Sequence, residues 1–530
     1  MGEGRPNVLL VVTDQQRGDA LGLDGHAVLE TPAMDWIGAS GTHFRRGYTE
    51  CPSCVPARRV LMSGQAPSAN GMVGMTGHPE WDPPATLAGQ LRDAGYETHL
   101  CGKLHLQPTR RRFGFEAMDL AESSRGRDND YLTWLRGEAP PHRWAMANGA
   151  PSNGWIGRPT HLPEEKTLAF WTVSRAIDFL ETRDPTAPFF LNVSFMDPHP
   201  PFTPPAFFFD RYERMDLPEP VIGDWVPEFQ GPRRGMDPEL SEDMERWSRR
   251  LHLDPAPMHH CRAGYYGLVN HVDMQLNRLF QYMRDKGLLY DTFIMFVSDH
   301  GEMLGDHHLF AKTWPYEASV RVPFLARAPQ SMGFPRQVEV AAPVGLQDVM
   351  PTLLDAAGCE IPASVTGRSL LPWMRGESPE WRDVLHGEHA GQYREADGNH
   401  WIVNERHKYI WFSQTGEEHL FDVVEDPNEE RDLAATSVLG EPGVGARKTP
   451  HRFPPRTAES ASPPGEGEEA PRFGETEAQR NSEVSPDVDL GWWRGRLAEE
   501  LADRPEGFSE GGELVVGQPH GMFVPGKGRG

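Results

Sequence analysis

The sequence predicts an α/β fold, in which helices cover both faces of a central sheet and a smaller C-terminal sheet follows. Two observations support this prediction. Short apolar runs rich in β-branched and aromatic residues alternate with helix-like stretches along the first three quarters of the chain. Runs of this kind are typical of strands that are buried on both faces. Near the C-terminus, further strand-like runs flank a segment of very different composition.

Four apolar runs are the clearest strand candidates, and each leads into polar residues. They are NVLLVV (7–12), YETHL (96–100), FFLNVSF (189–195) and FIMFVS (293–298). The stretches 83–95 and 271–287 carry apolar residues at three- and four-residue intervals before a glycine, so we expect them to form helices. In such folds ligands bind beyond the carboxyl ends of the strands. Polar residues at those four ends therefore predict one shared site.

The C-terminal part is predicted to form a smaller domain. Strands are expected at 408–412 and 417–423, and an amphipathic helix at 489–503 whose Trp492-Trp493 pair docks onto the protein. The segment 436–485 is rich in Pro, Gly, Ser and Glu and reads as disordered. The predicted units are a catalytic domain (1–375), a smaller domain (376–435), the disordered insert (436–485) and a helix and tail that complete the smaller domain (486–530). The cluster His386-Gly387-Glu388-His389 is expected on a solvated loop, with substrate recognition as the alternative.

Composition narrows the class of protein. The net charge of −25 argues against binding to nucleic acid or to anionic membranes. No apolar run reaches the roughly 18 to 20 residues that a membrane span needs. The N-terminus lacks the pattern of a secretory signal, and five cysteines in 530 residues do not form a disulfide framework. We therefore expect a cytoplasmic protein; the sequence does not indicate its oligomeric state.

The stretch ECPSCVPARRVLMSG (50–64) contains the most informative cysteines. Pro56 suits the first turn of a helix that can continue to Gly64, which places Cys54 at a helix N-terminus with Arg58 one turn further on. A cysteine in that position has a lowered pKa and raised reactivity. The overlapping C-x-x-C of Cys51 and Cys54 leaves a redox pair or a zinc site as alternatives, although no second cysteine pair completes a zinc ribbon.

Acidic and cationic residues complete the predicted site. Asp14 and Gln15 follow the first strand, and Asp299 and His300 follow a late one; their oxygen and imidazole donors suit Ca²⁺ or Mg²⁺, with Mn²⁺ favoured by the imidazole. Taken alone, Asp14 is better explained as a helix N-cap or turn residue, and the metal interpretation depends on its pairing with Asp299 and His300. The basic residues expected around the same site are Lys103, His105, His199, Lys312 and Arg58. Each alone is explained as a surface residue; together they form a pocket for a tetrahedral oxyanion, with histidines as general acid and base.

These residues resemble those of the type I sulfatases of the alkaline phosphatase superfamily. The resemblance runs from about residue 5 to 434 and resumes at 489. It rests on seven elements in the expected order: NVLLVVTDQQ, CVPARRVLMSG, GYETHLCGKLHL, SFMDPHPPF, VSDHGEMLGDHHLFAKTWPYEASVRVPFL, QDVMPTLLDAAG and GRSLLP. The resemblance implies an alkaline-phosphatase-like α/β fold with a large mixed sheet flanked by helices, and a smaller C-terminal domain with an antiparallel sheet.

The resemblance also implies a mechanism. A maturation enzyme would oxidise Cys54 to Cα-formylglycine, whose hydrate is the nucleophile that attacks a sulfate monoester. Asp14, Gln15, Asp299 and His300 would hold one divalent metal, most simply Ca²⁺, together with residue 54. Arg58 and Lys103 would stabilise the hydrate and the sulfate, and His105 would act as the base. His199 and Lys312 would contact the sulfate and assist the leaving oxygen, so that Lys103, His199 and Lys312 bind substrate.

Three positions depart from the common family pattern. Ala57 replaces a serine in the maturation motif, Gln15 stands where many members have aspartate, and His300 stands where many have asparagine. Aspartate followed by histidine also occurs in relatives resembling phosphonate monoester hydrolases and choline sulfatases. A phosphonate monoester or phosphodiester hydrolase is therefore the alternative enzyme, and an anion-binding protein with unmodified Cys54 is the non-catalytic one. The sequence does not distinguish a small-molecule from a carbohydrate sulfate.

Overall fold

The computed structural model describes residues 5–76, 79–122, 129–138, 149–150, 153–227, 233–234, 250–437 and 489–527. An eight-stranded sheet forms the centre of the large part, in the order β11-β2-β10-β9-β1-β6-β4-β5. Its strands are β11 (Val338–Val340), β2 (Thr42–Phe44), β10 (Phe324–Arg327), β9 (Thr292–Ser298), β1 (Asn7–Asp14), β6 (Phe189–Pro198), β4 (Glu97–Gly102) and β5 (Ala117–Leu120). The central strands are parallel, and β10 is antiparallel to both of its neighbours, which makes the sheet mixed.

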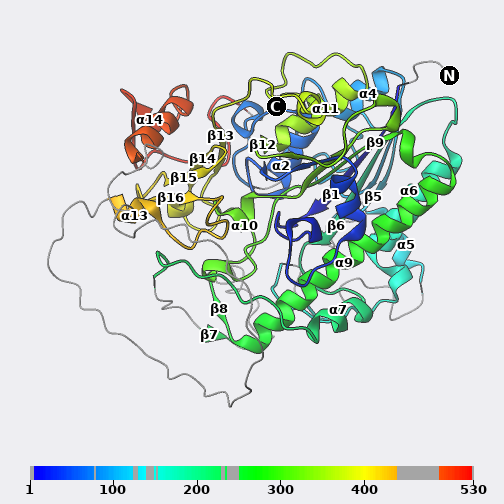
Figure 1. The fold of residues 1–530 in the computed structure, drawn as a ribbon, viewed down its shortest axis with the longest axis horizontal. Helices are drawn as coiled ribbons and strands as arrows, with labels where there is room; N and C mark the ends of the chain where they lie inside the picture. Colours follow the sequence, from blue (N-terminus) through cyan, green and yellow to red (C-terminus); the bar gives the residue numbers. More distant parts are fainter. Residues whose placement is uncertain are drawn as a thin grey trace, which may run out of the picture.

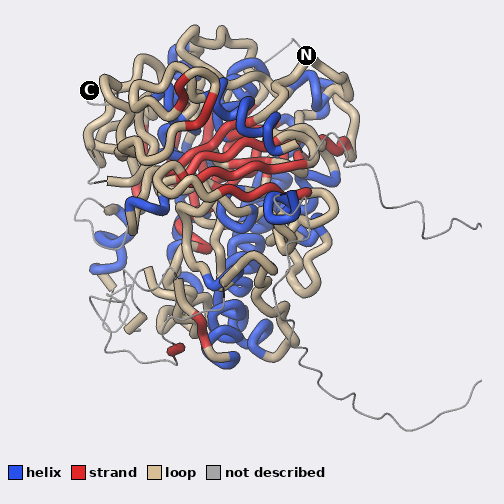
Figure 2. Tube along the Cα trace, turned by 90° about the vertical axis from the view of Figure 1, so that its left-hand side faces the viewer, coloured by secondary structure: helices blue, strands red, loops and turns tan. Residues whose placement is uncertain are grey.

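Helices cover both faces of this sheet, as Figure 2 shows. Leu9 and Val11 of β1 face one hydrophobic core, formed with α1 (Pro32–Ala39), α6 (Leu168–Thr182) and α9 (Pro255–Asp285). Val8 and Leu10 face the opposite core, formed with α2 (Cys54–Ser63), α4 (Leu87–Asp93) and α11 (Val349–Ala356). The alternation follows from the two-residue period of a strand, and it explains why residues 8–12 are all apolar.

A second sheet of four antiparallel strands lies beside the large one (Figure 1). Its strands are β13 (Leu385–His389), β14 (Asn399–Val403), β15 (His407–Phe412) and β16 (Glu418–Asp422). One face packs on Tyr48, Met303 and Trp314 of the large part. The other face is covered by α14 (Leu490–Glu500). The α/β fold with a mixed sheet and a smaller antiparallel sheet is thus the predicted one.

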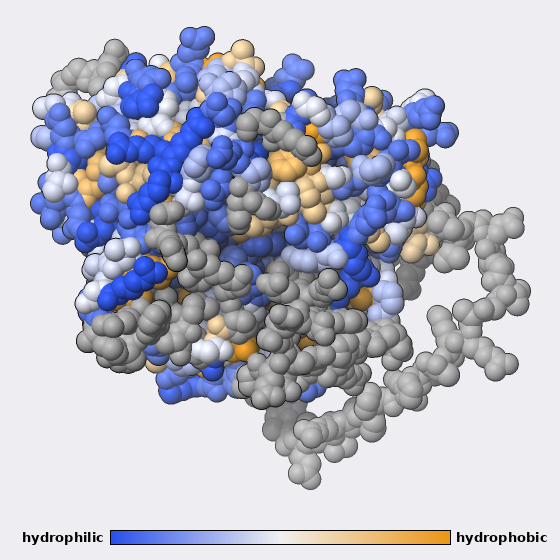
Figure 3. Space-filling model, turned by 180° about the vertical axis from the view of Figure 1, so that it is seen from behind, coloured by the Kyte–Doolittle hydropathy of each residue, from blue (hydrophilic) through white to orange (hydrophobic). Residues whose placement is uncertain are grey.

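Shorter elements connect these layers. They are β3 (Gly47–Tyr48), α3 (Pro67–Asn70), α5 (Asp130–Arg136), α7 (Ala206–Glu213), β7 (Arg233–Arg234), β8 (His252–Leu253), α10 (Glu317–Val320), β12 (Val344–Gly345), α12 (Leu371–Met374), α13 (Leu433–Ser437), β17 (Ser509–Glu510) and β18 (Glu513–Leu514). No helix in the described part of the chain is both long enough and apolar enough to cross a membrane. The face shown in Figure 3 is mostly hydrophilic, with scattered apolar patches, as expected for a chain of high net charge.

Several element boundaries differ from those predicted. The helix expected at 271–287 is the last part of α9, which begins sixteen residues earlier, at Pro255. The N-terminal half is not predicted because it packs against α7 as well as the sheet, so its apolar residues do not lie on one face. The helix expected at 83–95 is shorter, since Thr86 caps α4 by accepting a hydrogen bond from the backbone N–H of Gly89. The predicted insert 436–485 lies almost wholly outside the described residues.

The segment His386-Gly387-Glu388-His389 is not a solvated loop, and that prediction is wrong. It forms most of β13, with Glu388 and His389 fully buried. A buried carboxylate needs a partner, and Arg504 donates two hydrogen bonds to Glu388, at 2.7 and 2.6 Å. Because Arg504 lies after α14, more than a hundred residues further along the chain, no local sequence pattern predicts this pairing. The docking predicted for the tryptophan pair holds for Trp493, which is buried on the small sheet, whereas Trp492 is 47% exposed.

Candidate functional site

The site lies at the carboxyl edge of the large sheet, and its residues lie at or just after the ends of four parallel strands. Asp14 ends β1, and Asp299 and His300 directly follow the neighbouring β9. Lys103 and His105 follow β4, and His199 follows β6. Parallel pairing of β1 with β6 and β9 brings these strand ends to one edge, as the sequence predicts.

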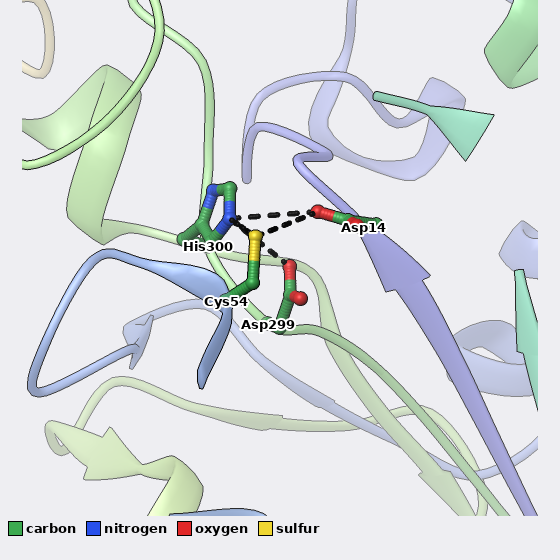
Figure 4. A group of neighbouring side chains, drawn as sticks. All are labelled: Asp14, Cys54, Asp299 and His300. Atoms are coloured by element: carbon green, nitrogen blue, oxygen red, sulfur yellow. Dashed lines mark hydrogen bonds and ion pairs between the residues drawn. The ribbon is translucent and has the colours of Figure 1, made fainter. Parts of the chain in front are cut away.

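Cys54 enters this edge from α2, where it is the first residue of the helix. Ser53 precedes it in an extended conformation, and Gly64 ends the helix with φ 65°, a left-handed conformation that glycine adopts without strain. Cys54, Asp14, Asp299 and His300 place one donor atom each within 4.8 Å of one another, and all four are buried (Figure 4). The Cys54 Sγ lies 3.2 Å from His300 Nε2 and 3.7 Å from Asp14 Oδ1.

His300 is oriented by its second ring nitrogen. Nδ1 donates to the Gly301 carbonyl at 2.9 Å, which directs Nε2 at the cluster. Nε2 is 3.5 Å from an oxygen of Asp14 and 3.5 Å from one of Asp299. Gly301 itself allows a close approach, because a Cβ there would lie 2.1 Å from the Ala318 carbonyl.

Gln15 stands next to this cluster in a strained backbone conformation, with φ 74°. Its backbone N–H donates to Asp299 Oδ1 at 3.1 Å. Its side-chain oxygen accepts from Lys312 Nζ at 3.0 Å, and its amide nitrogen donates to Glu302. Lys312 Nζ is also 3.0 Å from Cys54 Sγ, so Gln15 and Cys54 share one lysine.

Arg58, one turn along α2 from Cys54, is held by three hydrogen bonds. Its guanidinium donates to Asp299 Oδ2 at 2.9 Å, to the Lys103 carbonyl at 2.8 Å and to Ser194 Oγ at 2.9 Å. Burial alone would lower its pKa, but the carboxylates of Asp299 and Asp14 raise it. The side chain is 4% exposed, and such a fixed positive charge in a dry site acts more strongly than one in water.

Opposite charges around the cluster set its protonation. Burial and the Asp14 carboxylate raise the pKa of the Cys54 thiol, but Lys103, Lys312 and His300 lower it well below its usual value. Burial likewise opposes ionisation of Asp14, yet Lys103, to which it is hydrogen-bonded, and His199 bring its pKa well below the ordinary range. Burial and Asp14 raise the pKa of Asp299.

Two further histidines face the cluster and are both held neutral. Burial and then Lys103 lower the pKa of His105, whose side chain also interacts with that of Cys54. Burial and then Lys312 lower the pKa of His199 to about 3. His199 Nδ1 donates to the Pro200 carbonyl at 2.8 Å, so its Nε2 is the nitrogen that can accept a proton. A neutral imidazole can serve as a base near neutral pH.

Sequence reasoning missed three residues that hold this site together. Ser194, inside β6, accepts from Arg58. Glu122 accepts from the backbone N–H of His105 at 2.8 Å. Glu302 accepts a hydrogen bond from the Gln15 side-chain amide. Its position three residues after Asp299, in the polar run that follows a predicted strand, could have indicated a role at the site. The other two lie on or near strands without any motif of their own.

Cys51 does not join the cluster. It is buried, as are Cys101 and Cys261, and all five cysteines of the chain are free thiols. Burial and then Glu388 raise the pKa of Cys51 well above its usual value. A redox or zinc role for the C-x-x-C pair therefore finds no support in the described residues.

The fold and this strand-edge site define a hydrolase of the alkaline phosphatase superfamily. The sequence profile of the sulfatase family matches residues 6–359, and that of the C-terminal region of N-sulphoglucosamine sulphohydrolase matches residues 305–441. The chain belongs to the sulfatase family. It is thus a sulfuric ester hydrolase, as the sequence predicts.

Curated relatives and solved structures agree with that assignment. An arylsulfatase of Clostridium perfringens is 38% identical over 442 residues, which are 80% of this chain and 89% of the relative. A choline-sulfatase of Rhizobium meliloti is 30% identical, covering 82% of this chain and 83% of the relative. The crystal structure of a phosphonate monoester hydrolase of Agrobacterium radiobacter matches with a TM-score of 0.67 at 27% identity, over 82% of this chain and 92% of that one.

Proposed function

We propose that the protein hydrolyses a sulfate monoester and that Cys54, converted to Cα-formylglycine by a maturation enzyme, supplies the nucleophilic oxygen. The observation that carries this proposal is the position of Cys54. It is the first residue of α2, buried within 4.8 Å of two carboxylates and an imidazole, with Arg58 and two lysines around it. A cysteine with only a packing role would not need two carboxylates, an imidazole and three cationic side chains around it. Pro56 and Arg58 complete the maturation motif around Ala57.

The donor set fits one hard divalent cation. Asp14 and Asp299 offer carboxylate oxygens, His300 offers Nε2, and Gln15 can offer its amide oxygen if Lys312 releases it. Two carboxylates favour Ca²⁺, and one imidazole leaves Mn²⁺ or Mg²⁺ as alternatives. When bound, the metal would polarise oxygen atoms at residue 54 and lower their pKa.

The chain's own side chains would then do the following. Arg58 and Lys103, fixed by their hydrogen bonds to Asp299 and Asp14, hold positive charge beneath the sulfate. His105, neutral beside residue 54, takes the proton whose removal releases sulfate. Lys312 contacts the sulfate and stabilises the departing oxygen from the other side. His199 assists the leaving oxygen once the anionic substrate has raised its pKa and Nε2 carries a proton.

A phosphonate monoester or phosphodiester could occupy the same site, and one observation favours this second candidate. The site carries Asp299 followed by His300, and besides the phosphonate monoester hydrolase above, a multifunctional alkaline phosphatase superfamily protein of Trinickia caryophylli is 30% identical over 83% of this chain. Sulfate remains the leading substrate, because the arylsulfatase is more similar over a comparable length.

The alcohol part of the substrate can be a small molecule or a carbohydrate. An ulvan-active sulfatase of Formosa agariphila is 28% identical over 71% of this chain, which supports testing sulfated saccharides beside aryl sulfates and choline sulfate. We place the protein in the cytoplasm; five free cysteines without a disulfide support a reducing compartment. Cell fractionation tests that placement.

Mass spectrometry of the peptide containing residue 54 tests the central proposal. Protein co-expressed with a formylglycine-generating enzyme should show conversion of the thiol to the aldehyde. The same preparation should hydrolyse an aryl sulfate faster than a phosphonate monoester or a phosphodiester, and Cys54→Ala should abolish the activity. An unmodified Cys54 in an active enzyme, or activity that survives Cys54→Ala, contradicts the proposal.

A further inference from the structure

The loop that leads into Cys54 is held by the small sheet rather than by its own domain alone. The backbone N–H of Glu388 donates to the Glu50 carbonyl at 2.8 Å. His389, the last residue of β13, contacts the Ser53 hydroxyl through Nε2 at 2.9 Å. One strand therefore holds both ends of the residues that precede the nucleophile.

The Ser53 side chain does not cap its helix as an N-cap serine usually does. It is the N-cap residue of α2, with φ −157° and ψ 152°, and a serine there ordinarily accepts a hydrogen bond from the first turn of its helix. Its side chain makes no such bond, and its hydroxyl turns to His389 instead. Only the Ser53 carbonyl joins the helix, by accepting from the N–H of Ala57 at 3.0 Å. Forgoing a cap costs the helix stability unless the new bond replaces it.

The hydrogen bonds of the His389 ring fix which nitrogen donates and which accepts. Its Nδ1 donates to the Ala390 carbonyl at 2.6 Å, so in the neutral ring Nε2 has a lone pair and accepts from the Ser53 hydroxyl. The side chain is fully buried, and burial lowers its pKa to about 4, which keeps the ring neutral. The backbone N–H of Ala390 donates to the Val73 carbonyl at 2.7 Å, which anchors the same stretch of chain.

We infer that His389 is a positioning residue for the nucleophile: through the Ser53 hydroxyl it fixes the start of α2 and hence the direction in which residue 54 enters the site. The residue touches neither the four-residue cluster nor, by this inference, the substrate. The inference rests on the proposed function, since it assigns the small sheet a part in aligning that same residue 54.

A double-mutant cycle tests this inference. Ser53→Ala, His389→Gln and the double variant are co-expressed with the maturation enzyme, and kcat and KM for an aryl sulfate are divided by the formylglycine content measured by mass spectrometry. That correction matters because Ser53 borders the maturation motif. Each single variant should lose about ten- to a hundredfold in kcat with KM nearly unchanged, since small misplacements of a reacting group have effects of that size. The double variant should lose no more than the worse single one.

Two further variants separate positioning from stability. Ser53→Thr keeps the hydroxyl and should restore most of kcat, which also covers the case that His389→Gln does not fold. His386→Gln is the matched control on the same strand, because that ring bonds to His400 rather than to the loop. It should lower the melting temperature without changing kcat. Losses of Ser53→Ala and His389→Gln that multiply in the double variant, or a kcat unchanged in Ser53→Ala, overturn the inference. A wild-type protein with unmodified Cys54 or no sulfatase activity instead overturns the proposed function.

Discussion

Lys312 offers the sharpest test of how the site treats the leaving group. Its ammonium lies 3.0 Å from both Cys54 Sγ and Gln15 Oε1, and the residue is 8% exposed. It is therefore placed to stabilise negative charge that develops on an oxygen next to residue 54. Lys312→Met keeps the length of the side chain and removes the charge. Loss of one preorganised donor in a dry site costs about 3 to 4 kcal/mol in the transition state, or roughly a hundred- to a thousandfold in kcat.

The assay compares aryl sulfates whose leaving phenols differ in pKa. A poor leaving group carries more negative charge in the transition state, so the loss in Lys312→Met should grow as the pKa of the phenol rises. Lys286→Met, on an exposed lysine just beyond α9, is the matched control and should change nothing. Equal losses across the series, normalised to formylglycine content, would refute assistance to the leaving oxygen and leave Lys312 with sulfate binding alone.

Three other outcomes are expected. Ser194→Ala removes an acceptor from the buried Arg58 guanidinium and should destabilise the protein by about 1.5 to 3 kcal/mol in chemical denaturation, with a parallel loss of kcat. Ser174→Ala, which removes the acceptor of a more exposed arginine between α6 and α9, should cost less stability and leave kcat intact. Burial lowers the pKa of His419, but hydrogen bonds from its ring to Asp432 and Glu417 raise it to about 9. Because the folded pKa is above the ordinary value of 6.5, this stability is fully present below pH 6.5 and is lost as pH rises through 9. Asp432→Asn should therefore lower the free energy of unfolding by about 2 kcal/mol at pH 6, with the difference closing toward pH 9.5; a difference independent of pH would contradict the pairing. Chelation with EDTA should abolish sulfatase activity and lower the melting temperature, and restoration by Ca²⁺, Mn²⁺ or Mg²⁺ identifies the metal; full activity after exhaustive chelation would exclude a catalytic metal.

The part of this molecule that the sequence predicts well is the part that obeys local rules. NVLLVV reads as a strand buried on two faces because alternate residues face two separate cores. Asp14 and Asp299 could be placed together because parallel strands that end in polar residues share an edge. Cys54 could be placed at a helix start from Pro56 and Gly64 alone.

The part that the sequence does not predict depends on partners far along the chain. The polar run from His386 to His389 looks solvated until Arg504 supplies the charge that lets Glu388 be buried. The Ser53 contact with His389 spans 336 residues, and a serine before a helix is otherwise read as a cap. Long-range pairing of this kind leaves no periodic signal in either segment.

The C-x-x-C pair shows how neighbours from the rest of the chain give two adjacent thiols opposite chemistry. Cys51 and Cys54 are both fully buried, so burial raises the pKa of each. The carboxylates of Glu388 and Glu50 raise the pKa of Cys51 further, which outweighs its hydrogen bond with Ser53 and keeps it a thiol. Around Cys54 the ammonium groups outweigh Asp14 and lower its pKa. The same small sheet that brings Glu388 to Cys51 also brings His389 to Ser53. It thus keeps one cysteine unreactive and, by our inference, aligns the other.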